Sequence, residues 1–275
     1  MSRRAWLAGA IPLIALLVIF TMAVPSEPDE AHPLIQALVP TAILGIPLAA
    51  AAMTVARRFE LAAAGADWPA RLLSVATTGL DGAGEEWGRA MRSELASIEG
   101  PQERRSFAIG CTLTSIRRSV DRRAWSAAGL AAIILTFGVL VFSRVSFAAG
   151  QTGTMSFTLL APVVVLSVTG FVAGSRRSFR HGLLTGALAL VLSLIGVLAV
   201  QVVEAGYWYD NAGIFIVDGD APLQPIERIT ALLDPLTPSF ILLFLAWWAP
   251  WPVLGAALAT RRRVDAGAMA HTTVI

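Results

Sequence analysis

Few side chains of this 275-residue chain belong to the types that bind metals, and those few are scattered along it. The chain has one cysteine, Cys111, and three histidines, whereas a zinc site gathers about four nitrogen or sulfur ligands. Asp218 and Asp220 could contact calcium, but this ion takes about six or more oxygen ligands. We therefore expect neither a metal site nor a bound cofactor.

The motifs of the common enzyme classes are also missing from the sequence. There is no glycine-rich phosphate loop with its lysine, no pair of histidines one helical turn apart, and no Gly-x-Ser-x-Gly turn. We therefore expect that the protein is not an enzyme. Energised transport would then need a separate ATPase subunit.

One spacing predicts a surface for binding another protein. Trp87, Met91, Leu95 and Ile98 recur at steps of four, four and three residues, which places them on one face of an α-helix. Such a stripe is a candidate docking surface for helix-in-groove contacts with a cytoplasmic protein. The alternative is that the stripe packs on neighbouring helices and on the lipid headgroup layer, with arginines at the phosphates.

A second spacing predicts contact between two helices. Gly170 and Gly174, and then Gly182 and Gly186, each fit the pattern in which small residues four apart let membrane helices approach closely. Because both pairs flank one short arginine-containing segment, we expect the two helices to pack together there. This pattern predicts helix packing and gives no reason to expect a small-molecule ligand.

The elements that position these residues follow from the composition. The chain is 56% hydrophobic and only 15% charged, with a mean hydropathy of +0.68, whereas soluble domains carry roughly 25% charged residues. Six charge-free runs are long enough to cross a bilayer, which takes about 20 residues of helix. They are Trp6–Val24, Leu34–Ala56, Ala124–Ser143, Phe157–Gly174, Leu183–Val203 and Phe240–Thr260.

These runs predict an all-α, polytopic membrane protein with six transmembrane helices and a cytoplasmic helical hairpin between the second and third. The parts are a two-helix membrane segment (1–56), a polar module (57–123), a four-helix membrane segment (124–263) with an extracytoplasmic loop (204–239), and a cytoplasmic tail (264–275). A secretory signal peptide is the competing interpretation of the first run. Its long apolar core and the lack of a clear cleavage site favour an uncleaved span.

The arginines predict the orientation in the membrane. All 21 basic residues are arginine, and only Arg144 and Arg228 fall outside the segments that six spans place on the same side as both termini. Basic residues are retained on the cytoplasmic side. We therefore expect a multi-pass protein of a bacterial cytoplasmic membrane, with both termini and the polar module in the cytoplasm.

The polar module is predicted to be helical, with its last helix running without a break into the third span. Its arginines are largely balanced by acidic residues, and it contains no recognisable nucleic-acid-binding motif, so we expect no nucleic-acid partner. No ionisable residue lies inside the six predicted spans. The nearest is Glu204, which we interpret as an ordinary interfacial residue. Prolines around Trp247 to Pro252 leave a transporter-like substrate site as a less favoured alternative.

Part of the module resembles a cytoplasmic segment that recurs in poorly characterised actinobacterial multi-pass membrane proteins. The resemblance spans about Trp68 to Ser119 and is carried by Trp68-Pro69-Ala70-Arg71-Leu72-Leu73, Glu86-Trp87-Gly88-Arg89-Ala90-Met91, Glu94-Leu95-Ala96, Glu99-Gly100, Glu103-Arg104-Arg105 and Phe107-Ala108-Ile109-Gly110-Cys111. A chain whose basic residues are all arginine is typical of a GC-rich genome, as actinobacterial genomes are. The family has no assigned activity, so the resemblance implies a helical module and no particular chemistry.

Together these features favour a non-enzymatic membrane protein whose module engages a cytoplasmic partner protein in regulation or assembly. The alternative is a permease-like transmembrane subunit that works with a separate ATPase. A continuous polar cavity through the membrane helices is required only by the alternative.

Overall fold

The computed structural model describes residues 10–11, 14, 33–62, 67–77, 83–119, 121–150, 155–176, 178–216 and 226–260. Within these ranges the chain forms helices and short connections without strands, so the predicted all-α class is confirmed. The helices are α2 (Pro33–Ala62), α3 (Trp68–Thr77), α4 (Ala83–Ser97), α5 (Pro101–Ser119), α6 (Arg122–Ala148), α7 (Met155–Arg176), α8 (Phe179–Ala212), α9 (Arg228–Leu233), the 3₁₀ helix η1 (Asp234–Leu236) and α10 (Pro238–Trp248). Residues 250–260 are also helical and follow α10 after a one-residue turn.

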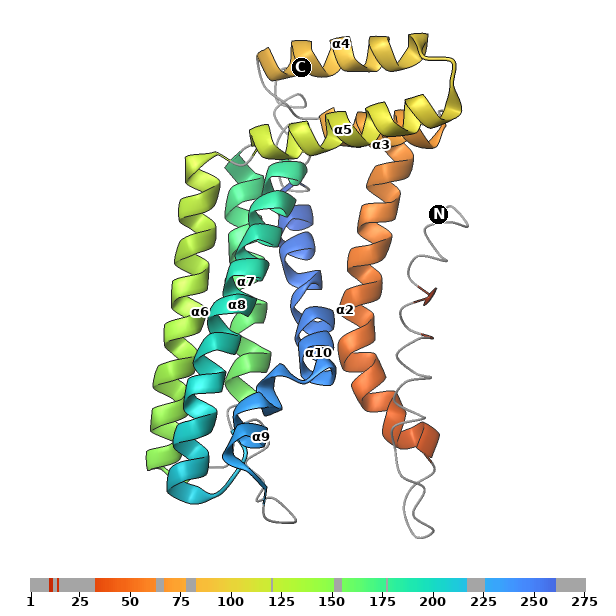
Figure 1. The fold of residues 1–275 in the computed structure, drawn as a ribbon. Coiled ribbons are helices and arrows are strands. Elements are labelled where there is room, and N and C mark those ends of the chain that lie inside the picture. Colours follow the sequence, from red (N-terminus) through yellow and green to blue (C-terminus); the bar gives the residue numbers. More distant parts are fainter. Residues whose placement is uncertain are drawn as a thin grey trace, which may run out of the picture.

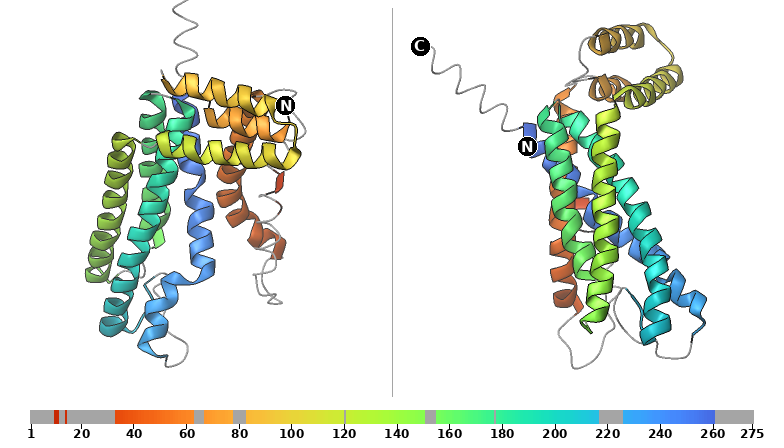
Figure 2. Two further views of the ribbon diagram at one scale, coloured as in Figure 1. Left: turned by 45° about the horizontal axis from the view of Figure 1, so that its top comes forward. Right: turned by 90° about the vertical axis from the view of Figure 1, so that its left-hand side faces the viewer.

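The helices form two layers. Helices α6, α7, α8 and α10 stand side by side, and α2 stands next to α10 (Figure 1). Helices α3, α4 and α5 lie across one end of this bundle, while α9 lies at the other end (Figures 1 and 2). We call these the module end and the far end.

Four of the helical stretches are long and apolar enough to cross a membrane: Arg122–Ala148, Phe157–Ser175, Phe179–Ala212 and Arg228–Thr260. In α2, the stretch Thr41–Arg57 is apolar but shorter. The first predicted span, Trp6–Val24, lies outside the described residues except for three positions. The described chain therefore has four candidate membrane-spanning helices.

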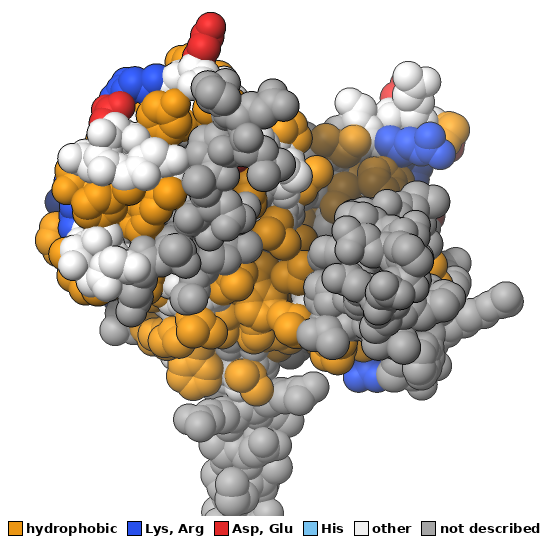
Figure 3. Space-filling model, turned by 90° about the horizontal axis from the view of Figure 1, so that it is seen from below, with side chains coloured by type: hydrophobic (Ala, Val, Ile, Leu, Met, Phe, Trp, Pro, Cys, Tyr) orange, Lys and Arg blue, Asp and Glu red, His pale blue; other side chains and the backbone are white. Residues whose placement is uncertain are grey.

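The outer surface of the bundle is apolar, as a lipid environment requires. Ile133, Leu160 and Val203 are each more than 60% exposed. Seen from the far end, the described side chains are mostly hydrophobic, and charged ones lie at the margin (Figure 3). A soluble protein rarely exposes so much contiguous apolar surface.

One predicted connection between helices is wrong. The module was expected to run without a break into the third span, but α5 ends at Ser119 and α6 begins anew at Arg122. Asp121 has extended backbone and its carboxylate accepts a hydrogen bond from Ala124 N at 2.8 Å, so it is the N-cap of α6. In the predicted outer loop 204–239, helical structure continues to Ala212, and α8 ends at Gly213, whose positive φ of 68° suits a helix C-cap.

A proline and two tryptophans join α7 to α10. Pro162 has no N–H to donate to the carbonyl of Thr158, one turn earlier in α7. Trp248 Nε1 donates to that carbonyl at 3.0 Å, and Trp247 Nε1 donates to Leu159 O at 2.6 Å. Both tryptophans are buried in the core of the bundle, where Trp248 replaces the hydrogen bond that Pro162 cannot donate.

Candidate functional site

The module has its own small apolar core, and part of the predicted docking stripe belongs to it. Leu73 of α3, Leu95 of α4 and Ala108 of α5 are buried against one another, with Met91 and Cys111 packed on them. Cys111 Sγ lies 3.6 Å from Met91 Sδ. Leu95 is only 2% exposed, so it is covered by the module itself and offers no surface to a partner.

The other members of the predicted stripe lie at the edge of this core. Trp87 and Ile98 are half-buried. The structure therefore brings α4 onto α3 and α5 through the stripe, which is the packing that we weighed as the alternative to docking. Helices α3 and α4 also approach each other closely at Gly88, because a Cβ at this position would lie 2.8 Å from Thr77 Cβ.

Arg104 connects all three helices of the module. Its guanidinium donates to the carbonyls of Leu95 and Ile98, the latter at 2.9 Å, and so binds the C-terminal end of α4. The same group pairs with Asp67 at 2.9 Å, while Asp67 also accepts from Ala70 N and caps α3. Partial burial opposes ionisation of Asp67, but the hydrogen bonds from Ala70 and Arg104 outweigh it and lower the pKa of this carboxyl.

A cavity opens at this corner of the module, where α3 and α5 begin and α4 ends. It has a volume of about 560 Å³ and is lined by Asp67, Trp68, Pro69, Glu99, Pro101, Arg104 and Arg105. Trp68 is 49% exposed although it belongs to the most hydrophobic class of side chains. We call these seven residues the corner pocket. Sequence periodicity missed it, because its residues come from three separate segments.

A second apolar surface lies on α5. Ile109 and Leu113 are 45% and 62% exposed, and they project away from the buried face that carries Ala108. They are one helical turn apart, so they form a short stripe on a helix that lies across the end of the bundle (Figure 1).

The module is attached to the bundle by a polar bridge. Ser115 of α5 is fully buried and donates to the carbonyl of Ala76 in α3 at 2.6 Å. Arg180, in the first turn of α8, donates to the hydroxyl of Ser115. This bridge connects α3 and α5 to the start of α8, one of the four candidate membrane-spanning helices.

The four predicted packing glycines come together at one junction of three helices. A Cβ on Gly182 of α8 would lie 2.7 Å from Gly170 O and 2.8 Å from Gly174 Cα, both in α7. The third helix, residues 250–260, belongs to the predicted span Phe240–Thr260, but its place at this junction was not predicted. A Cβ on Gly170 or on Gly186 would lie 2.3 Å from Pro252, so these glycines admit this helix as well.

The far end holds a buried charge cluster that the sequence interpretation missed. Glu204 has no exposed surface and accepts hydrogen bonds from Ser143 at 2.9 Å and from Arg144 at 2.7 Å. Trp208 donates to Ser143 at 2.8 Å, and the Arg144 guanidinium lies 3.6 Å from the ring centre of Tyr207. Glu204 is therefore not an ordinary interfacial residue, because α8 continues past it and α6 covers it.

Known proteins give no further guidance. The described residues contain no group of three or more His, Cys, Asp or Glu side chains that could hold a metal ion. No family model, curated protein or solved structure matches the chain. The resemblance to actinobacterial membrane proteins stays a prediction.

Proposed function

We propose that this is a non-enzymatic protein of a bacterial cytoplasmic membrane, with six spans and both termini inside, whose polar module engages a cytoplasmic partner protein in regulation or assembly. The corner pocket carries this proposal. It replaces the predicted stripe of α4 as the docking surface, because Leu95 and Met91 are used within the module.

The ion pairs support the orientation. Arg144 and Arg228, the two arginines predicted to lie outside, each pair with an acidic residue at 2.7 Å, Glu204 and Asp210 respectively. Local neutralisation lowers the cost of moving an arginine across the membrane. The remaining arginines lie in segments that the prediction places inside, as expected from the retention of basic residues there.

The chemistry of the corner pocket favours a protein as its occupant. Tryptophan and arginine are the residues that most often dominate the binding energy of protein interfaces. Trp68 is half-exposed and lines the corner pocket together with Arg105. Two prolines and the Asp67–Arg104 ion pair form other parts of the pocket wall and restrict its movement. Rigid walls of this kind lower the entropy lost on binding.

The permease alternative stands second. It requires a continuous polar path through the bundle, whereas the described core contains a large apolar cluster with Leu135, Leu166 and Phe244. The buried polar side chains of α8, Thr185, Ser193 and Gln201, lie eight residues apart, about 12 Å along the helix. A cavity beside Phe142 and Phe157 is also apolar. These observations favour a bundle that anchors the module over one that conducts a solute.

The test compares two tryptophans of similar exposure. Trp68→Ala removes the wall of the corner pocket, whereas Trp125→Ala removes a 53% exposed tryptophan from α6 and serves as the control. Each tagged variant is cross-linked in native membranes, purified and analysed by quantitative mass spectrometry. A partner recovered with the wild type and Trp125→Ala but reduced at least tenfold with Trp68→Ala supports the proposal, since an interface tryptophan contributes roughly 2 kcal/mol or more.

Equal recovery with all three proteins contradicts docking at the corner pocket. The identity of a Trp68-dependent partner separates the two functions. A regulatory or assembly protein agrees with the first, and an ATPase agrees with the permease alternative.

A further inference from the structure

We propose that a groove between α6 and α7 binds one anionic lipid from the membrane leaflet next to the module, with its acyl chain in the groove and its phosphate at Arg123. This inference concerns the bundle and does not depend on the corner pocket. It rests on the length of the groove, its apolar walls and the polar side chains at one end.

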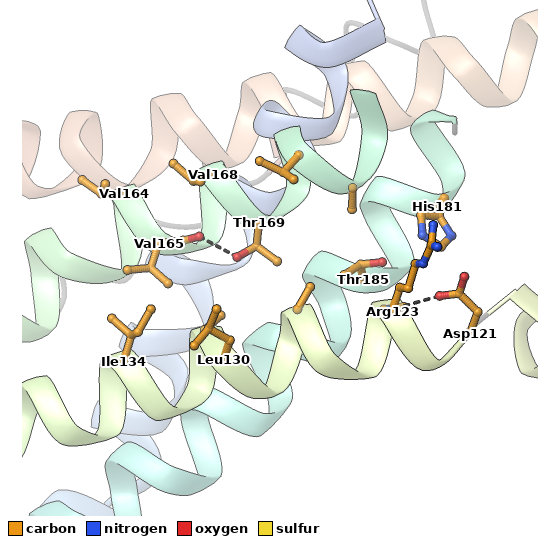
Figure 4. Close-up of a pocket in the computed structure, with 15 residues that line it drawn as sticks. Asp121, Arg123, Leu130, Ile134, Val164, Val165, Val168, Thr169, His181 and Thr185 are labelled. Carbon is orange, nitrogen blue, oxygen red and sulfur yellow. Dashed lines mark hydrogen bonds between the residues drawn. The ribbon is translucent and has the colours of Figure 1, made fainter. Parts of the chain in front are cut away.

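The groove is apolar along most of its length. It has a volume of about 640 Å³, within the range of roughly 300–1,000 Å³ that is usual for small-molecule sites. Leu130 and Ile134 of α6 form one wall, and Val164, Val168 and Val172 of α7 form the other (Figure 4). These five side chains are between 41% and 63% exposed, so the groove opens to the surrounding lipid.

One end of the groove is polar. Arg123 and His181 lie there with Asp121, and Thr185 reaches it from α8 (Figure 4). The carboxylate of Asp121 accepts the N-cap hydrogen bond from Ala124 N, and Arg123 is the exposed basic side chain at this end. The end is therefore suited to an anion.

Thr185 gives an independent indication of a ligand. It is 1% exposed, and its Oγ1 has no hydrogen-bond partner among the described residues. An unsatisfied buried hydroxyl costs free energy, roughly 1–3 kcal/mol, unless a ligand or water completes it. Because Thr185 lines the groove below Arg123, a phosphate or glycerol oxygen of a lipid would satisfy it.

The length of the groove identifies the kind of ligand. From Arg123 to Ile134 it extends about 17 Å along α6, at 1.5 Å per residue. One leaflet of a bilayer, headgroups included, is roughly 20 Å deep. A groove with apolar walls over this depth and a cationic end at the membrane surface fits a single lipid chain with its headgroup.

The experiment uses the full-length protein in nanodiscs of phosphatidylcholine that contain a minor fraction of phosphatidylglycerol with a photoreactive group in its acyl chain. After irradiation, labelled peptides are identified by mass spectrometry. We expect labelling concentrated on the peptides that contain residues 130–134 and 164–172. A phosphatidylcholine probe with the same chain should label these peptides about tenfold less, the loss expected for one charge-assisted contact.

Two pairs of variants make the test specific. Arg123→Gln should reduce labelling by phosphatidylglycerol about tenfold, whereas Arg122→Gln, which changes an adjacent exposed arginine outside the groove, should leave it unchanged. Val168→Phe should fill the groove and abolish most of the labelling, whereas Val203→Phe, on the lipid-facing side of α8, should not. Labelling spread evenly over the exposed faces of the bundle, or equal effects within each pair, overturns the proposal.

Discussion

At the scale of single residues, Glu204 forms a buried ion pair that its position in the sequence does not reveal. It lies one residue beyond a hydrophobic run, where a polar side chain is usually at the membrane surface. In the structure it is fully buried, and its carboxylate is neutralised by Arg144. A buried charge without its partner is strongly unfavourable, so the two residues should act as one unit.

A double-mutant cycle tests this coupling. Arg144→Gln should lower the free energy of unfolding by about 3 kcal/mol, because it leaves the carboxylate of Glu204 buried without a counter-charge. Glu204→Gln should cost less, about 1–2 kcal/mol, since Arg144 is 45% exposed and can reach water. The double variant should be more stable than the sum of both losses predicts. The free energies of unfolding of the wild type, the two single variants and the double variant are measured on purified protein in mixed micelles. If the losses of the two single variants add up to the loss of the double variant, the coupling is contradicted.

Asp67 makes the stability of the module dependent on pH. Its pKa is lowered in the folded protein by hydrogen bonds from Ala70 and Arg104, against the opposing effect of burial, so the unfolded state binds more protons in acid. The stabilisation is complete above the unfolded pKa of about 3.9 and is lost as the pH falls through the lowered folded value.

Cys111 reports on this loss, because it is the only cysteine and packs in the core of the module. Its labelling by 4,4′-dithiodipyridine, which reacts in acid, should accelerate below about pH 4 in the wild type. Asp67→Asn should label faster than the wild type at neutral pH and show no further acceleration in acid. Identical pH profiles for the two proteins would show that Asp67 does not stabilise the module.

At the scale of helices, the close junction of α7, α8 and residues 250–260 depends on glycine. Gly170→Ala would place a methyl group 2.3 Å from the carbonyl of Pro252, and a backbone atom cannot rotate away. We expect a loss of about 2–3 kcal/mol in the free energy of unfolding, as for overpacked cores. Gly129→Ala in α6 is the matched control, with no atom within 4 Å of its added methyl group, and should be neutral or slightly stabilising. Similar losses for both variants in micelle unfolding would contradict this account.

The contact between α7 and α10 offers a test by rescue. Trp248→Phe keeps an aromatic ring but removes the donor to Thr158 O, so the bundle should lose about 1–3 kcal/mol. Pro162→Ala restores a backbone N–H one turn after Thr158 and should recover part of that loss in the double variant. If Pro162→Ala does not stabilise the Trp248→Phe protein, then Trp248 does not replace the hydrogen bond that Pro162 cannot donate to Thr158 O.

Much of this architecture could be predicted from the sequence, because long apolar runs and Gly-x-x-x-Gly spacings are local signals. The runs predicted the helices that became α6, α7 and α8, and the glycine pairs predicted where α7 and α8 meet. The third helix at the glycine junction, the partners of Trp247 and Trp248, and the burial of Glu204 could not be predicted. Each depends on a contact between residues more than 50 positions apart in the chain, which periodicity does not encode.

The module shows the same limit. Its apolar stripe on α4 was visible, but a stripe alone does not say whether it faces a partner or the rest of the chain. The structure answers this for Leu95, which α3 and α5 cover. The corner pocket brings together the starts of α3 and α5 and the end of α4, so it appears only when these three helices are placed in space.

For the whole molecule, the central claim is that the polar module lies in the cytoplasm while α9 lies outside, with both chain ends inside. The docking of a cytoplasmic partner requires this orientation, and it decides which leaflet supplies the lipid of the α6–α7 groove. Two positions on opposite ends of the bundle report on it. Cys111 is in the module, and Ile229 in α9 is 53% exposed.

The most direct measurement is labelling of intact cells with a membrane-impermeant maleimide. Three single-cysteine proteins are compared: the wild type with Cys111, and Ile229→Cys and Ser2→Cys, each combined with Cys111→Ser. The account predicts that Ile229→Cys is labelled in intact cells, whereas Cys111 and Ser2→Cys are labelled only after the membrane is made permeable and the protein denatured. Labelling of Ser2→Cys in intact cells, with Cys111 still protected, would contradict the two spans predicted before the module, Trp6–Val24 and Leu34–Ala56. Labelling of Cys111 in intact cells would contradict the cytoplasmic module and the partner proposed for it.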